Sequence, residues 1–117
     1  MKHLKKGKKF HRKTDQRKAL LKQLSAQLIL KEKIKTTLIK AKETQRTTEK
    51  LITLSKKQNL SCFRALLAKL PEKAAQKLYY QLAPLYLTKP GGYTRIIKLA
   101  KPRLNDAAPM AYIELIK

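Results

Sequence analysis

The chain has 117 residues, which allows one domain with a modest core and excludes two domains of ordinary size. Its 29 lysines and arginines outnumber its 7 acids, and the resulting net charge of +22 destabilises a compact body unless a polyanion neutralises it. We therefore expect a nucleic-acid partner in preference to an anionic membrane surface or an acidic protein, and no apolar run approaches the roughly 18 residues of a membrane span.

The first 13 residues form a separate basic segment. They contain seven lysines and arginines and no acid, with Leu4 and Phe10 as the bulky apolar side chains. Such a segment buries too little surface to offset the entropy of ordering. We expect a basic arm, disordered alone, that orders on a polyanion, with a solvated tail as the alternative. The lack of an apolar region after the basic start argues against a secretory signal, and motifs that begin almost at Met1 argue against an organelle transit peptide.

Helix and strand patterns follow the arm. A helix is expected from Thr14 or Asp15, either of which suits the N-cap, to about Lys31. Its apolar stripe consists of Leu20, Leu21, Leu24 and Leu28. The alternating β-branched run 33–37 predicts a strand, and a second helix is expected from Leu38 to about Lys57. The polar middle of that helix, residues 42–50, either faces water or lies on a partner.

Two shorter helices complete the helical part. The first is expected over about 61–70, with an apolar face of Phe63, Leu66, Leu67 and Leu70. Pro71 suits the first turn of the next helix, which is expected to end at Pro84. The face of this helix consists of Ala75, Leu78, Tyr79 and Leu82.

The strand-like runs 93–100 and 110–116 are joined by a loop at about 101–109, and antiparallel pairing is their simplest arrangement. With the strand at 33–37 they predict an α+β fold. We expect a small, mainly antiparallel sheet of about three strands, covered by about four helices. The arm then comprises residues 1–13 and a single domain comprises residues 14–117.

Two adjacent glycines, Gly91 and Gly92, stand before an aromatic residue and a cation. They make positive φ available twice at the entry to a strand, and strand geometry then puts Tyr93 and Arg95 on one face. Two interpretations stay open. Either this is an ordinary turn with Tyr93 packed at the domain edge, or bare glycine backbone approaches a phosphate that Arg95 also contacts.

Catalytic and metal-binding patterns are weak. His3 and His11 lie on the arm, where no packed pocket tunes them, and Cys62 precedes an apolar helix face and is expected to be a buried thiol. These residues cannot supply four zinc ligands, and the diglycine lacks the spacing of a phosphate-cradling loop. We expect no enzyme, no metal, no cofactor and no small-molecule substrate. The chemistry on offer is the binding of phosphates by cations and the stacking of RNA bases on aromatic and arginine side chains.

Six motifs occur in order along almost the whole chain. They are Met1-Lys2-His3 with Gly7 and Arg12, Arg17 with Ala19, Ile34–Leu38 followed by Lys40–Glu43, Leu51–Leu54 with Lys56, Gly91–Ile96, and Ala108–Leu115. In the identity, order and spacing of these six motifs, the chain resembles the bacterial-type large-subunit ribosomal protein family seventeen. The stretch 58–88 matches that family in helical pattern only.

The resemblance implies a structural constituent of the large ribosomal subunit, near the peptide-exit side, in the cytoplasmic ribosome or, alternatively, in an organelle stroma. It implies large-subunit rRNA and neighbouring large-subunit ribosomal proteins as partners, with no membrane. The candidate RNA contacts are Lys2, His3, Lys5, Gly7, Lys8, Lys9, Arg12, Arg17, Lys35, Lys40, Lys42, Gly91, Gly92, Tyr93, Arg95 and Arg103.

A basic DNA-associated, chromatin-like protein is the main alternative, because residues 61–83 could dock as a helix-turn-helix. The second helix of that pair offers few side chains suited to base edges. A third class, an RNA-modifying enzyme, lacks a plausible acid–base pair in this sequence.

Overall fold

The structure is a computed structural model that describes residue 10 and residues 12–116. The helices are α1 Thr14–Lys31, α2 Leu38–Ser55, α3 Leu60–Lys69 and α4 Glu72–Lys77, and α4 continues through a π-helical turn, η1 Leu78–Leu82, into a 3-10 turn, η2 Ala83–Tyr86. The strands are β1 Lys33–Thr37, β2 Thr94–Lys98 and β3 Met110–Leu115. The predicted α+β class is confirmed, and the expectations for residues 1–9 lie outside the described residues.

The three strands form one antiparallel sheet in the order β1-β3-β2. Ile113 of β3 lies opposite Ile34 on one side and Ile96 on the other, and this row belongs to the face that packs on the helices. The next row, Lys35, Tyr112 and Ile97, alternates to the opposite face. The sheet therefore packs on the helices with one face, while the other face carries Lys35 beside Tyr112 and the exposed Ile97.

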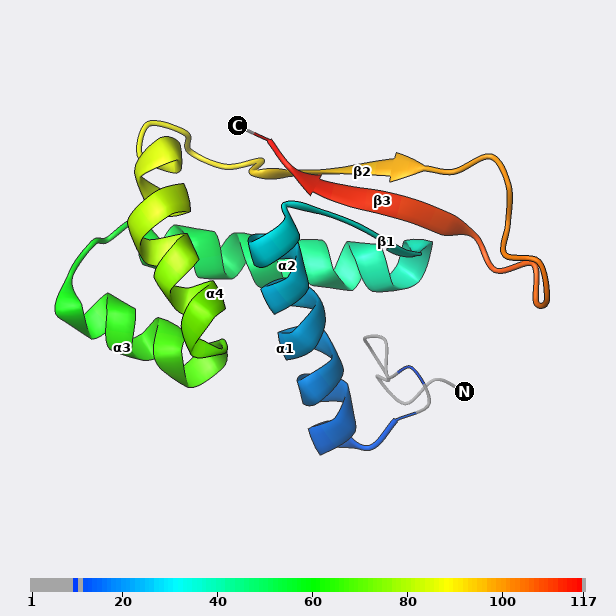
Figure 1. Cartoon of the computed structure of the whole chain (residues 1–117), viewed down its shortest axis with the longest axis horizontal. Coiled ribbons are helices and arrows are strands. Elements are labelled where there is room, and N and C mark those ends of the chain that lie inside the picture. Colours follow the sequence, from blue (N-terminus) through cyan, green and yellow to red (C-terminus); the bar gives the residue numbers. More distant parts are fainter. Residues whose placement is uncertain (1–9, 11, 117) are drawn as a thin grey trace, which may run out of the picture.

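The helices cover that apolar face and leave the other face of the sheet open (Figure 1). Helix α2 runs beneath the three strands, α1 crosses α2, and α3 and α4 lie at one end. The long connection between β2 and β3 extends beyond the sheet at the other end, and Leu104 in this connection is fully exposed. The result is a two-layer domain with one uncovered face.

The polar middle of α2 is partly buried in the core, which differs from both expectations for it, contact with water and contact with a partner. Thr44 and Thr48 are fully buried and continue the buried stripe that Ala41 begins and Ile52 extends. The spacing of three and four residues places these side chains on one helix face. A pattern based on hydrophobicity alone misses them, because threonine methyl groups pack like those of valine.

Helix α1 begins one residue earlier than a side-chain cap predicts. Lys13 occupies the N-cap position without a side-chain hydrogen bond, and its carbonyl accepts the backbone N–H of Arg17 at 2.9 Å. Thr14 is therefore already helical, and Asp15 lies in the first turn, where its charge suits the helix dipole. At the other end, Glu32 adopts a left-handed φ of 66° and leads the chain directly into β1.

Two further boundaries differ in their details from the expectation. Helix α3 begins at Leu60 because the side chain of Asn59 caps it, accepting the Cys62 N–H at 2.7 Å. Pro84 does not end the following helical segment, which continues to Tyr86. Proline is tolerated there because it lies in the first turn of a 3-10 segment, where its missing N–H is not needed.

Candidate nucleic-acid interface

The exposed side of α2 carries a row of cations. Lys42, Arg46 and Lys50 are all exposed and follow one another at intervals of four residues, so they share one face of the helix. Arg46 and Lys50 also line a groove of about 700 Å³ between α2 and the diglycine segment, which we call the diglycine groove. Its other lining residues are Glu43, Thr47, Glu49, Thr53, Gly91 and Tyr93.

Gly91 and Gly92 have different roles in this groove. Gly92 has a φ of +66°, a conformation that favours glycine, whereas the φ of Gly91 lies outside that region. A Cβ added at Gly91 would meet no atom within 4 Å. Positive φ is therefore used once rather than twice, and the Gly91 backbone borders open space beside Arg46 and Lys50.

Tyr93 does not share an exposed strand face with Arg95, and that part of the expectation is wrong. Its side chain is 2% exposed and its ring meets the ring of Tyr86 edge-on at 5.2 Å between centroids. The Tyr93 hydroxyl accepts a hydrogen bond from Lys56 Nζ at 2.8 Å, which lowers the pKa of the phenol, and donates to the Lys89 carbonyl at 3.2 Å. Because β2 begins at Thr94, the strand alternation does not extend to Tyr93.

Arg95 lies on the open face of the sheet, as expected for its position. Its guanidinium forms a salt bridge with Glu114 on the adjacent strand, and this hydrogen bond lowers the pKa of the Glu114 carboxyl. Lys33 approaches the same carboxylate at 3.9 Å and lies 4.6 Å from the centroid of the Tyr112 ring. The open face is thus a mixed surface in which the acid is already paired with two cations.

Lys35 and Arg103 are brought together at the far end of the sheet. Both line a groove of about 530 Å³ formed with Lys101, Leu104 and Met110. Arg103 forms a salt bridge with Asp106 that holds the pKa of that carboxyl down at about 2. These cations lie apart from Arg46 and Lys50, whose groove contains none of these residues.

The other candidate contacts lie at helix starts or outside the described residues. Arg12 donates from Nη1 to the Phe10 carbonyl at 3.0 Å, and Arg17 is half-buried in the first turns of α1. Lys40 is half-buried in the first turn of α2, where its N–H bonds to Thr37. The candidates that lie outside the described residues are Lys2, His3, Lys5, Gly7, Lys8 and Lys9.

Four cations that sequence reasoning did not select surround a second groove. Lys18 and Lys22 of α1, Lys50 of α2 and Lys69 of α3 line a groove of about 470 Å³, which we call the lysine-rimmed groove. It shares Thr47 and Lys50 with the diglycine groove, so the two adjoin. The sequence did offer one signal for this groove, because Lys18 and Lys22 are four residues apart and lie off the leucine stripe of α1. The position of Lys69 beside them depends on how α3 packs in the tertiary fold.

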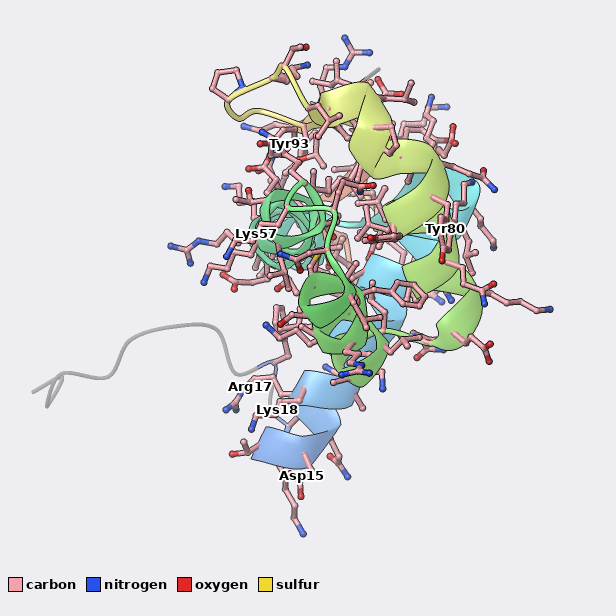
Figure 2. The ribbon with its side chains drawn as sticks, turned by 90° about the vertical axis from the view of Figure 1, so that its left-hand side faces the viewer. Asp15, Arg17, Lys18, Lys57, Tyr80 and Tyr93 are labelled. Carbon is pink, nitrogen blue, oxygen red and sulfur yellow. The ribbon has the colours of Figure 1, made fainter. Side chains whose placement is uncertain are left out.

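The exposed aromatic residue Tyr80 lies away from the cations at the start of α1 and just after α2 (Figure 2). Figure 2 shows Arg17 and Lys18 near the start of α1 and Lys57 just after α2 on one side of the molecule, with Tyr80 on the opposite side. Tyr80 is 64% exposed, and its ring contacts those of Phe63 and Tyr79 at 5.6 and 4.9 Å between centroids.

Other chemistry is sparse within the described ranges. No group of three or more metal-ligating side chains occurs among residues 10 and 12–116. Cys62 is buried, with its thiol donating to the Leu54 carbonyl at 2.8 Å. In the same part of the chain, no helix combines the length and the hydropathy that crossing a bilayer requires.

Comparison with known proteins connects this basic α+β domain to one family. The family model described as Ribosomal protein L17 matches residues 20–116. The large ribosomal subunit protein bL17 of Desulfovibrio desulfuricans is 46% identical over 116 residues, covering 98% of this chain and 68% of that protein. The protein of the same name from Sulfurihydrogenibium sp. is 44% identical over 118 residues, which cover 100% of this chain and 98% of that protein. This chain therefore belongs to the ribosomal protein L17 family.

Proposed function

We propose that the chain is a structural constituent of the large ribosomal subunit that binds large-subunit rRNA through its basic arm and the basic faces of its domain. Family membership supports the ribosomal assignment. The family resemblance also implies a position near the peptide-exit side, beside neighbouring ribosomal proteins, and the proposal includes it. The partners are then rRNA and those proteins, in a bacterial-type cytoplasmic ribosome.

The observation that carries the RNA-binding part is the surplus of cations around the two adjoining grooves. In the described part of the chain, no carboxylate forms a salt bridge with Lys18, Lys22, Lys50 or Lys69. Phosphates would replace the missing counter-charges, with the release of condensed ions as the driving force. Arg46, which does pair with Glu43 at 3.5 Å, remains 74% exposed at its side chain and still faces solvent.

The DNA-associated alternative receives less support from the helices that suggested it. In the segment 61–83, Ala74, Ala75, Leu78 and Leu82 face the core. A recognition helix needs a row of polar side chains that reaches base edges, and here the buried positions take up much of the helix surface.

Sedimentation of a cell lysate tests the proposed function. We expect the protein to travel with large subunits through a sucrose gradient after a high-salt wash, and to leave that fraction after ribonuclease treatment. Deoxyribonuclease should change nothing. Release of the protein by deoxyribonuclease alone, or its migration as a free protein before any wash, would contradict the assignment.

A further inference from the structure

The lysine-rimmed groove combines a charged rim with a largely apolar lining. Its rim holds Lys18, Lys22, Lys50 and Lys69 from three different helices, and all four residues are exposed. Four like charges around one groove repel one another, and this repulsion is relieved only by an anion. The rim therefore indicates an occupant that carries negative charge.

The lining below the rim is apolar apart from the hydroxyls of Ser25 and Thr47, and that of Thr47 already donates to the Glu43 carbonyl at 3.1 Å. Leu21, Leu51 and Ala68 contribute hydrocarbon, and Ser25 is fully buried with no hydrogen-bond partner for Oγ in the described chain. A buried hydroxyl without a partner is costly, so a ligand that supplies one gains affinity. An inorganic anion would not use the hydrocarbon, and a purely apolar ligand would not use the lysines.

A nucleotide meets all of these conditions in one chemical unit. An unstacked base presents an apolar face and a polar edge, and its neighbouring phosphates carry the charge that the rim requires. The volume of about 470 Å³ lies within the range of sites that enclose small organic groups. RNA loops and bulges expose such bases, whereas a fully paired duplex does not.

Three occupants other than RNA come into question: the arm of this chain, a second copy of the chain, and an acidic protein segment. The arm of this chain and a second copy of it are both strongly basic, so neither neutralises the rim. An acidic protein segment would, but the diglycine groove continues from the shared residues Thr47 and Lys50 with Arg46 and the open backbone of Gly91. The diglycine groove also holds Glu43, which pairs with Arg46, and Glu49, which accepts a hydrogen bond from the Thr94 hydroxyl. The four lysines and Arg46 still outnumber these two acids over the joined grooves, and this surplus suits a sugar-phosphate backbone.

We propose that the lysine-rimmed groove receives a single unpaired nucleotide of the bound rRNA. The base lies against Leu21, Leu51 and Ala68 and hydrogen-bonds to Ser25, while the flanking phosphates lie beside the four lysines. The inference rests on the proposed function and adds to it a specific subsite and the class of RNA element that occupies it.

Blocking the groove without changing its charge tests the inference. Ala68 is exposed and lines the groove, so Ala68→Trp fills the space while the core stays intact. Gln76→Trp places the same side chain on the exposed surface of α4, outside the groove, and is the matched control. Full-length proteins are titrated against a large-subunit rRNA transcript over a salt series, and thermal melting confirms that each variant is folded.

Ala68→Trp should weaken rRNA binding about tenfold, the effect of losing the contacts of one inserted base, with an unchanged dependence on salt. Gln76→Trp should bind as the unmodified protein does. Ser25→Ala should weaken binding on the order of threefold, the effect of one hydrogen bond, and should not lower the melting temperature. Lys22→Ala should instead make the salt slope shallower by about 0.7 to 0.9.

Photo-crosslinking identifies the occupant. With 4-thiouridine distributed through the transcript, the unmodified protein and Gln76→Trp should give nucleotide adducts within residues 18–25, 47–51 or 68–69, and Ala68→Trp should lose them. Equal affinity of Ala68→Trp and the unmodified protein, or adducts on the unmodified protein that all lie outside these groove residues, would overturn the inference. If the unmodified protein shows no preference for large-subunit rRNA over an unrelated RNA, the proposed function itself fails, which is a separate result.

Discussion

Tyr93 joins three segments of the chain through one side chain. Its ring packs on Tyr86 in the core, and its hydroxyl connects Lys56, which follows α2, to the carbonyl of Lys89. Lys56 Nζ also lies 5.1 Å from the centroid of the Tyr93 ring. Tyr93, a candidate RNA contact in the sequence, is thus the anchor of the segment that borders the diglycine groove.

Truncation of the Tyr93 side chain should therefore lower the free energy of unfolding. Tyr93→Phe removes the hydroxyl and should lower the free energy of unfolding by about 1 kcal/mol. Tyr93→Ala also leaves a cavity and should cost about 3 to 5 kcal/mol. Urea denaturation followed by circular dichroism measures both. An unchanged denaturation midpoint for Tyr93→Ala would show that the ring is not packed in solution.

The two glycines should respond differently to the same added methyl group. Gly92→Ala forces alanine to a φ of +66° and should destabilise the fold by about 1 to 2 kcal/mol. Gly91→Ala meets no atom and should leave stability unchanged or raise it by about 0.4 to 1 kcal/mol.

Measuring rRNA binding distinguishes the two interpretations of Gly91, a contact with phosphate or an ordinary turn. If a phosphate approaches its bare backbone, Gly91→Ala should weaken rRNA binding on the order of threefold. Filter binding at fixed salt measures this, with Ala100→Ser as an exposed control. Full affinity in the Gly91→Ala variant would leave the diglycine as a turn and nothing more.

At the scale of elements, α2 is unusual because its buried stripe contains hydroxyls. Thr44 Oγ1 and Thr48 Oγ1 are buried and have no hydrogen-bond partner within the described residues. Thr53 on the same helix is exposed, and its hydroxyl donates to the Glu49 carbonyl at 3.0 Å. Helix α2 therefore contains threonine hydroxyls with and without a hydrogen-bond partner among the described residues, so the two kinds can be compared directly.

Replacing a buried threonine by valine should stabilise the domain. Thr48→Val keeps the shape of the side chain and removes an unpaired hydroxyl, so the free energy of unfolding should rise by about 1 kcal/mol. Thr53→Val should change it by less than about 0.5 kcal/mol, as is usual for a surface position. Loss of stability in Thr48→Val, measured by thermal and urea unfolding, would show that this hydroxyl has a partner.

The elements themselves were largely predictable, because local patterns determine them. The β-branched alternation of residues 33–37 predicted β1, and the periodic leucines predicted the course of α1 to Lys31. The burial of Thr48 was not predictable from hydrophobicity, and the inward turn of Tyr93 depends on where β2 begins. The lysine-rimmed groove needs three helices packed together, which no local pattern contains.

At the scale of the whole molecule, arm and domain should divide the binding free energy. The seven cations of residues 1–13 lie close together in sequence, so deleting residues 2–13 should remove several phosphate contacts at once. For five engaged cations the slope of log affinity against log salt should become shallower by roughly 3.5 to 4.5. Helix α1 begins at Thr14, so the deletion leaves its residues in place, and the carbonyl of Met1 takes the N-cap position of Lys13.

Titration of full-length and truncated protein against a large-subunit rRNA fragment, and against an unrelated RNA of equal length, measures the division. The truncated protein should still prefer the rRNA fragment if, as we propose, the grooves of the domain bind it by shape. An unchanged salt slope would make the arm a solvated tail. Complete loss of preference would assign specificity to the arm alone.

The middle position of β3 has a consequence for synthesis. Among the described residues, β1 and β2 pair only with β3, which the ribosome makes last of the three. Neither strand can join this sheet until residue 115 has left the tunnel. The backbone N–H of Leu115 also donates to Glu32 at 2.9 Å, and that of Ile116 to Tyr93 at 2.8 Å. The pairing of β1 with β3, which joins Lys33 to Glu114, spans most of the chain, a topology that slows folding. The sheet therefore forms only once β3 has emerged, and the nascent chain presents its helices and its cations before it has a sheet.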